Sequence, residues 1–229
     1  MAWPRPLPRS RPAVKLTASA IANGWGFCLI AKHHGDRTSA SRRGCVSPKC
    51  AVEDVDYRNP RGLDRALFQK LAEGEWINAH DNLALIGPTG VGKSWLASAL
   101  GHKACRDNRS VLYQRVPRLF EALALARGDG RHPRLLRNLG RADLLILDDW
   151  GLEPLDAATR HDLLEILEER YGRRSTMITS QLPVDRWHEI IGDPTYADAI
   201  LDRLVHNAHR IELAGESMRR TRGKQNQKA

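Results

Sequence analysis

Apolar positions along the chain follow two patterns in turn: short continuous runs, and the three-to-four-residue spacing of an amphipathic helix. The runs predict strands at 82–86, 111–116, 144–148, 175–179 and 209–213. The helical spacing predicts helices at 63–71, 94–105, 117–127, 131–139, 157–171 and 196–207. Strands that alternate with helices are typical of α/β proteins, so we expect a parallel β-sheet flanked by helices on both faces.

Two of these segments also predict which side chains are buried. The 144–148 run is apolar until its final residue, as expected for a strand covered on both faces. On the 157–171 helix, the spacing predicts that Leu163, Leu164, Leu167 and Tyr171 face the core.

The first fifty residues show neither pattern. Pro4, Pro6, Pro8 and Pro12 stand among arginines and exclude a helix there. We therefore expect a disordered leader at 1–50, a folded core at 51–217 and a tail at 218–229.

Charge divides the chain in the same way. Residues 1–50 hold nine Lys or Arg and one acidic residue, and residues 218–229 hold five basic residues and no acidic one. Basic ends indicate either contact with a polyanion such as nucleic acid or solvated tails, and charge leaves both readings open. No run approaches the roughly 20 apolar residues that span a bilayer, so we expect a cytoplasmic protein without a membrane partner.

One motif defines the chemistry of the core. The stretch GPTGVGKS comprises Gly87, Pro88, Thr89, Gly90, Val91, Gly92, Lys93 and Ser94, between a predicted strand and a predicted helix. This is the pattern of a phosphate-binding loop, whose backbone N–H groups and helix start surround an anion. It predicts ATP as the ligand, with Lys93 on the β- and γ-phosphates and the Ser94 hydroxyl on Mg²⁺.

Two acids follow a strand further along the chain. The apolar run 144–147 leads into Asp148 and Asp149. Beside a phosphate loop, such acids are typical of Mg²⁺ binding and water activation, so we expect Asp148 on the metal and Asp149 on the attacking water. Without that loop, two acids at a strand end would be interpreted as caps of the next element.

Two further residues have more than one interpretation. Gln181 ends the fourth predicted strand, where it could sense the γ-phosphate or simply belong to a turn before Pro183. Arg203 lies on a late predicted helix. It is either a surface group paired with Asp198 or Asp202, or an arginine finger that reaches the nucleotide of a neighbouring subunit.

Residues 51–219 resemble the IstB-like ATP-binding proteins, which are helper ATPases of insertion-sequence transposons. These are relatives of the DnaC helicase loaders within the AAA+ superfamily. The resemblance rests on YRNPRGLDR (57–65), GPTGVGKSWLA (87–97), LLILDDWG (144–151), RSTMITSQLP (174–183), AILDRLVHN (199–207) and GESMR (215–219).

The resemblance implies an AAA+ ATPase that assembles on DNA as an ATP-dependent homo-oligomer and helps a cognate transposase to engage target DNA. It also implies a sensor-one role for Gln181, the finger role for Arg203 and a sensor-two-like role for Arg219. Residues 1–49 do not resemble the helical N-terminal region of the family, as a frameshift or a misplaced start would explain. Two alternatives therefore stay open: a DnaC-type replicative helicase loader, and an inactive nucleotide-binding remnant of a transposition protein.

Overall fold

The sheet has the predicted parallel arrangement. The computed structural model describes residues 28–30 and 50–218. In this part of the chain, six strands form one sheet in the order β1-β3-β4-β5-β2-β6. Five of them run parallel, namely β2 (Asn82–Ile86), β3 (Val111–Arg115), β4 (Leu144–Trp150), β5 (Ser175–Ser180) and β6 (Ala208–Glu212). The α/β fold that the sequence predicts is therefore confirmed.

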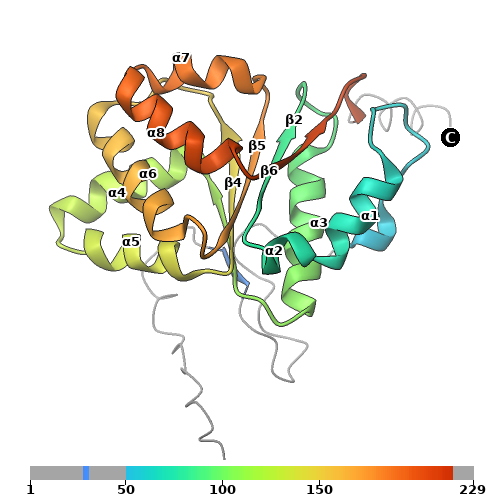
Figure 1. Ribbon diagram of the computed structural model, residues 1–229, viewed down its shortest axis with the longest axis horizontal. Coiled ribbons are helices and arrows are strands. Elements are labelled where there is room, and N and C mark those ends of the chain that lie inside the picture. The colour runs from blue at the N-terminus through green and yellow to red at the C-terminus, as the bar shows by residue number, and fades with distance from the viewer. Residues whose placement is uncertain (1–27, 31–49, 219–229) are drawn as a thin grey trace, which may run out of the picture.

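Helices cover both faces of the sheet (Figure 1). One face packs against α1 (Arg65–Glu73), α2 (Glu75–Asn78) and α3 (Lys93–Arg106). The other packs against α4 (Val116–Gly128), α5 (His132–Arg141), α6 (Ala157–Arg170), α7 (Trp187–Ile191) and α8 (Pro194–Val205). Successive β4 side chains enter the two cores in turn: Leu144 and Ile146 face α3, and Leu145 and Leu147 face the opposite layer. This explains why the strand is apolar from Leu144 to Leu147.

A short strand lies inside the segment that we expected to have no regular structure. Residues Cys28–Ile30 form β1, which pairs antiparallel with β3. For these three residues the expectation of a disordered leader is wrong, because they add hydrogen bonds to a sheet edge that β3 would otherwise expose. The remainder of 1–49 lies outside the described residues.

Two short helices were not predicted, because each depends on burying one tryptophan. The side chains of Trp76 in α2 and Trp187 in α7 are 4 % and 0 % exposed. Each indole Nε1 donates a hydrogen bond to a preceding backbone carbonyl, that of Leu71 or Leu182. A helix of four or five residues is too short to show a periodic pattern, so tertiary packing decides it. Val52–Asp54 and Val184–Arg186 form 3₁₀ turns.

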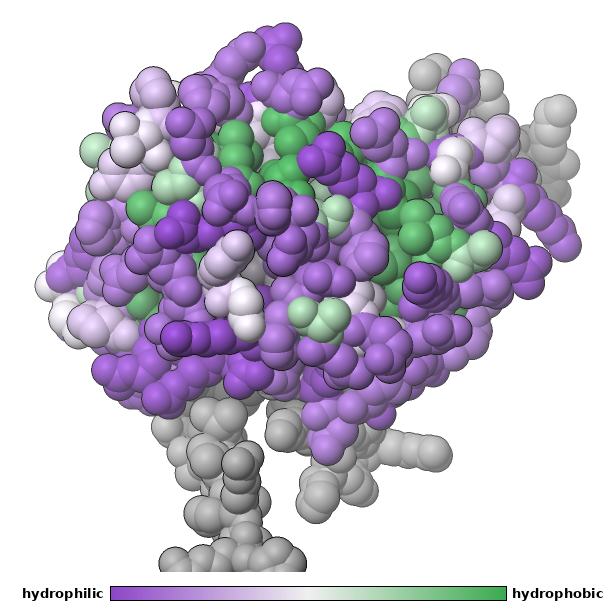
Figure 2. Space-filling view, in the orientation of Figure 1, coloured by the Kyte–Doolittle hydropathy of each residue, from purple (hydrophilic) through white to green (hydrophobic). Residues whose placement is uncertain are grey.

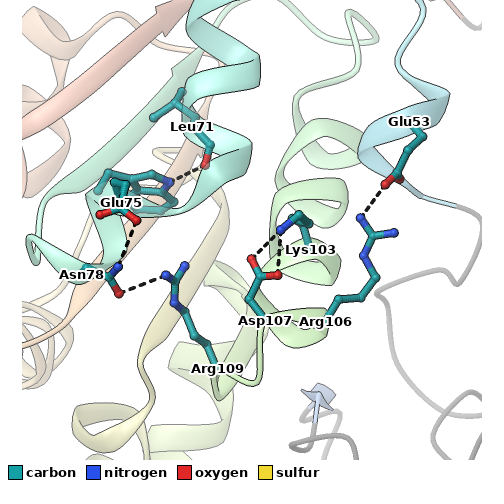
Figure 3. A network of polar contacts seen from close by, with 9 residues as sticks. Glu53, Leu71, Glu75, Asn78, Lys103, Arg106, Asp107 and Arg109 are labelled. Atoms are coloured by element: carbon teal, nitrogen blue, oxygen red, sulfur yellow. Dashed lines mark hydrogen bonds and ion pairs between the residues drawn. The ribbon is translucent and has the colours of Figure 1, made fainter.

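Polar contacts fasten the carboxyl end of α3 to its neighbours (Figure 3). The guanidinium of Arg106 donates to Glu53 at 2.6 Å, and that of Arg109 donates to Asn78 at 3.0 Å. Along the helix, Lys103 pairs with Asp107 at 2.6 Å. These exposed pairs each contribute little, and they lie at the far end of the helix whose start forms the phosphate loop.

Buried Arg170 holds the amino edge of the sheet, where the parallel strands begin. Its side chain is 1 % exposed, and its guanidinium donates to the carbonyls of Leu139, Ala142 and Ser175 and to the Thr176 hydroxyl. Tyr171, the next residue, is 47 % exposed, so the prediction that it faces the core is wrong. The helix ends at Arg170, and the chain turns before the tyrosine can continue the buried stripe.

The visible surface is mostly hydrophilic (Figure 2). Apolar surface gathers in two places on this face, over α7 and α8 and between β6 and α1. In the described ranges, no helix has both the length and the apolar composition that crossing a bilayer requires.

Candidate functional site

The loop between β2 and α3 begins at the carboxyl edge of the sheet. Gly90 and Gly92 have positive φ, at +87° and +98°. A Cβ at Gly90 would lie 2.1 Å from the Ser217 hydroxyl, so a side chain is excluded there by space as well as by backbone conformation. The loop delivers the chain into α3, whose first turn has no side-chain cap. Its N–H groups are thus available to an anion, as the sequence motif predicts.

Lys93, the first residue of α3, folds back over its own loop. Its side chain is buried, and the Nζ atom donates to the carbonyls of Gly87 and Pro88 at 2.6 and 2.8 Å. Burial lowers the pKa of Lys93, while Asp148 and Asp149 act in the opposite direction. The ammonium therefore lies within the loop, at the position from which a lysine can reach bound phosphates.

Asp148 is fully buried and accepts three hydrogen bonds from hydroxyl groups. Ser94 Oγ donates to Oδ1 at 2.8 Å, and Thr179 Oγ1 donates to the same oxygen at 2.5 Å. Tyr113 donates its phenol proton to Oδ2 at 2.5 Å. Burial, and next the charge of Asp148, raises the pKa of Tyr113 far above its usual value, so this phenol stays a donor. Ser94 and Asp148 thus bring two hard oxygen ligands together, which suits Mg²⁺.

Asp149 adopts a strained conformation beside Asp148. Its φ is +63°, in a region where residues other than glycine are uncommon, and the β4–β5 register shifts between Leu147 and Trp150. Its N–H donates to Thr179 Oγ1 at 3.1 Å. The irregularity interrupts the usual alternation of the strand, so the side chain is 29 % exposed whereas that of Asp148 is 0 % exposed. Two adjacent carboxylates therefore have different access to solvent.

Gln181 lies beside the loop. It directly follows β5, and its Oε1 accepts a hydrogen bond from Thr89 at 2.6 Å. The structure thus brings Gln181 together with the phosphate loop, where a polar side chain can contact a terminal phosphate.

Arg203 lies at the opposite edge of the sheet. Its backbone carbonyl accepts a hydrogen bond at 2.8 Å from Asn82, the first residue of β2. The loop starts after Ile86, four residues or roughly 13 Å further along this strand. The structure therefore does not bring Arg203 to the nucleotide loop of its own chain.

The surroundings of Arg203 differ from the predicted surface pair. Its guanidinium contacts Glu168 at 3.0 Å and the Ala199 carbonyl at 2.7 Å. The sequence pointed to Asp198 or Asp202, and neither contact is present, because the packing of α8 on α6 brings Glu168 closer. Arg219 lies outside the described residues.

Comparison with known proteins agrees with this geometry. The family described as IstB-like ATP binding protein matches residues 30–228. The chain belongs to this family. It is 80 % identical over 168 residues to y4pL of Sinorhizobium fredii, a protein named as an insertion sequence ATP-binding protein, and the match covers 73 % of this chain and 69 % of that one.

Solved structures give the fold of this IstB-like chain. DnaI superposes with a TM-score of 0.64 at 25 % identity, over 72 % of this chain and 91 % of that one. The DnaC helicase loader superposes with a TM-score of 0.59 at 20 % identity, over 71 % of this chain and 97 % of that one. The fold is that of a phosphate-loop protein of the AAA+ class.

Besides Thr179, three side chains of the site were not identified from the sequence. Tyr113 and Arg115 alternate along β3, which pairs with β4 so that Arg115 lies opposite Asp148. The Arg115 Nε atom is 4.0 Å from Asp148 Oδ2 and 3.8 Å from Asp149 Oδ2. The available signal was weak: the strand begins with Val111 and Leu112 and ends with three consecutive polar residues, so no alternation singles out Tyr113 and Arg115.

The third side chain, Arg61, lies beneath the loop. It is 4 % exposed, and its NH1 atom donates to the Val91 carbonyl at 2.9 Å and contacts Met218 Sδ at 3.1 Å. The Met218 N–H donates to the Gly90 carbonyl at 2.9 Å. Met218 thus packs against the core, although the sequence analysis assigned it to the tail. No local sequence pattern predicts this long-range contact.

Proposed function

We propose that this IstB-like protein hydrolyses ATP with Mg²⁺ and assembles on DNA as a homo-oligomer that assists a transposase. The observation that supports hydrolysis most strongly is the meeting of Ser94 and Asp148 at 2.8 Å beside buried Lys93. At the carboxyl ends of the strands, this arrangement brings together two metal ligands, the Ser94 hydroxyl and the Asp148 carboxylate, and one phosphate-binding cation, the Lys93 ammonium. Together with the solvent-accessible Asp149, this set contains the groups that phosphoryl transfer to water requires.

Each group has a distinct proposed role. The backbone of 87–94 and the Lys93 ammonium bind the phosphates, and Ser94 and Asp148 hold Mg²⁺, which supplies charge neutralisation when bound. Asp149 orients the attacking water, because its carboxylate is the more exposed of the two. Gln181 contacts the γ-phosphate from its position on Thr89. Arg219 stays a proposed nucleotide contact, on the family resemblance.

Assembly is proposed from the position of Arg203. Its guanidinium lies at the amino edge of the sheet, away from its own loop, and its side chain is 25 % exposed. An arginine there stabilises phosphate charge only in the site of a neighbouring copy. Arginines supplied in this way contribute about 10³- to 10⁵-fold to turnover.

The transposase partner is proposed from the relative that is 80 % identical, whose name places it in an insertion sequence. The helicase-loader alternative has weaker support, since the likeness to DnaC at 20 % identity concerns the fold. Charge complementarity with DNA phosphates rests on the basic residues of 1–50 and 218–229.

The decisive test is ATP turnover with and without double-stranded DNA. We expect DNA to stimulate the parent protein, and Lys93→Ala to lose at least about 100-fold in turnover because an electrostatic contact to the transferred group is gone. Lys103→Ala is the matched control, because this lysine lies on the same helix and pairs with Asp107 on the surface. Parental turnover in Lys93→Ala would contradict the assignment of the site.

The oligomer is tested by mixing two variants. Lys93→Ala and Arg203→Ala are each expected to be inactive, but mixed interfaces pair an intact loop with an intact arginine. Partial return of DNA-stimulated turnover in the mixture supports an arginine acting between subunits. If Arg203→Ala is as active as the parent at concentrations where the parent assembles, Arg203 is a surface residue.

A further inference from the structure

The Asp148 carboxylate is held from three separate elements. Ser94 lies at the start of α3, Thr179 lies in β5 and Tyr113 lies in β3. Two of these donors are buried within strands of the sheet: Thr179 is 0 % exposed and Tyr113 is 5 % exposed. Ser94 is only partly buried, and its hydroxyl makes the longest of the three bonds, at 2.8 Å against 2.5 Å for each of the others.

We propose that Tyr113 is a positioning residue for the metal site, and that with Thr179 it fixes the Asp148 carboxylate in the orientation that binds nucleotide-bound Mg²⁺. This inference rests on the proposed ATPase function and adds residues to the same site. Ser94 is the donor whose hydroxyl turns from the carboxylate to the metal. The two strand hydroxyls stay in place during that exchange.

The reach of a tyrosine explains why this residue type stands at position 113. In the parallel register Tyr113 lies opposite Ile146, two residues before Asp148. Asp148 shares a face with Ile146 and lies roughly 6.6 Å further along β4, while β3 and β4 are roughly 4.8 Å apart, so the diagonal step from Tyr113 to Asp148 is roughly 8 Å. A phenol spans this step, whereas a serine or threonine hydroxyl at 113 would fall short of the carboxylate.

The carboxylate has capacity for a metal contact besides these bonds. Its two oxygens accept about four hydrogen bonds in total. Oδ1 accepts from Ser94 and Thr179, and Oδ2 accepts from Tyr113. Turning the Ser94 hydroxyl toward a metal releases one position on Oδ1 and leaves the other two bonds intact, so the metal meets a carboxylate that needs no reorientation.

The hydrogen bond from Tyr113 to Asp148 also affects how Asp148 interacts with Arg115. Its Nε atom approaches the same oxygen, Oδ2, at 4.0 Å, which is too long for a hydrogen bond. Its side chain is 52 % exposed, and it can therefore move closer. Without the phenol, the carboxylate is free to rotate toward this guanidinium and form a direct ion pair, which opposes metal binding. Tyr113 thus keeps Asp148 directed at the metal rather than at Arg115.

The test measures metal binding rather than turnover. Mn²⁺ is titrated into protein saturated with a non-hydrolysable ATP analogue, and free Mn²⁺ is followed by electron paramagnetic resonance. Tyr113→Phe removes one oxygen atom, and we expect Mn²⁺ affinity to fall roughly 10- to 100-fold, as for other groups that orient a metal ligand. Binding of a fluorescent ATP analogue in EDTA should stay within about twofold of the parent, because the phosphate loop is unchanged.

Two further variants separate positioning from simple stability. Tyr113→Phe combined with Arg115→Gln should regain part of the lost Mn²⁺ affinity, because the competing cation is removed. Ser175→Ala is the control, since it deletes a buried hydroxyl at the far end of β5, where it bonds to the Trp76 carbonyl. It should leave Mn²⁺ affinity unchanged.

The outcomes distinguish the two levels of the proposal. If the parent binds Mn²⁺ with the nucleotide and Tyr113→Phe binds it equally well, the positioning role is wrong and the ATPase proposal stands. If the parent binds the fluorescent nucleotide but gains no Mn²⁺ site, the metal assignment itself fails, and the role of Tyr113 fails with it.

Discussion

The two edges of the sheet each contain a fully buried charge, and the two charges have different kinds of partner. At the carboxyl edge, Asp148 accepts hydrogen bonds from three side-chain hydroxyls. At the amino edge, Arg170 donates to three backbone carbonyls and one hydroxyl. Burial, and next the nearby charge of Arg174, lowers the pKa of Arg170 to about 9, so it stays protonated at neutral pH.

The partners indicate which charge does chemistry. Backbone carbonyls of strands and helix ends cannot turn away, so Arg170 locks the α5–β4 connection to the start of β5. A hydroxyl rotates about one bond, so the Ser94 contact to Asp148 can be exchanged for a metal ion. Arg170, whose partners are mostly backbone carbonyls, therefore stabilises the fold. Asp148, which lies beside the phosphate loop and can exchange the Ser94 hydroxyl for a metal ion, belongs to the functional site.

The largest expected effect concerns the fixed charge. Arg170→Met keeps much of the side-chain volume but leaves buried acceptors without donors, so we expect a loss of about 3–5 kcal/mol in the free energy of unfolding. Chemical denaturation measures this loss, and nucleotide affinity of the folded fraction should be unchanged. Arg174→Met is the control: its side chain is 41 % exposed and pairs with Asp143, so a loss below about 1 kcal/mol is expected. If both variants lost the same free energy of unfolding, the stabilising role assigned to buried Arg170 would be wrong.

A smaller effect on stability and a large effect on turnover are expected at the two acids of the carboxyl edge, Asp148 and Asp149. Asp149→Asn should bind ATP but hydrolyse it on the order of 100-fold more slowly, because the group that orients water is lost. Asp148→Asn should in addition require more Mg²⁺ for half-maximal turnover. A Mg²⁺ titration of both variants checks this difference. Normal hydrolysis by Asp149→Asn would show that the more exposed acid does not act on water.

The smallest effect is expected at the exposed pair on the amino edge. Glu168→Gln removes the carboxylate that contacts Arg203 at 3.0 Å, and the carboxylate is 55 % exposed. The free energy of unfolding should change by less than about 1 kcal/mol. If Arg203 acts on a neighbouring subunit, DNA-stimulated turnover in the same variant should stay equal or rise, because the guanidinium is released. A fall in turnover with unchanged stability would mean that Glu168 helps to position Arg203.

The sequence predicted the elements whose own residues determine them. The run 82–86 forms a strand with the predicted bounds, since five apolar or amide residues lie between a polar turn and a glycine loop. The phosphate loop could be located from the spacing within its own motif, and Asp148 and Asp149 from the apolar run that leads into two acids. The α2 and α7 helices could not be located in this way, because each is stabilised by one tryptophan packing into the hydrophobic core, and the core is formed by residues from other parts of the chain.

Contacts between residues on different strands and helices could not be predicted from local sequence patterns. Tyr113 reaches Asp148 across 35 positions, and Glu168 reaches Arg203 across 35 positions in another part of the fold. Tyr171 was wrongly placed in the core because the helical stripe was extended one residue beyond the turn that ends α6. For the two contacts the deciding fact is which strands and helices are neighbours, and for Tyr171 it is where the helix ends; the periodic pattern contains neither.

The contacts beneath the phosphate loop have a thermodynamic consequence for the whole chain. Arg61 and Met218, 157 positions apart, meet each other and the carbonyls of Val91 and Gly90. Where a ligand and this junction both favour the ordered loop, their coupling is reciprocal: the ligand stabilises the junction by the same free energy by which the intact junction strengthens ligand binding. We therefore expect a pulling force that separates Arg61 from Met218 to weaken nucleotide binding as well.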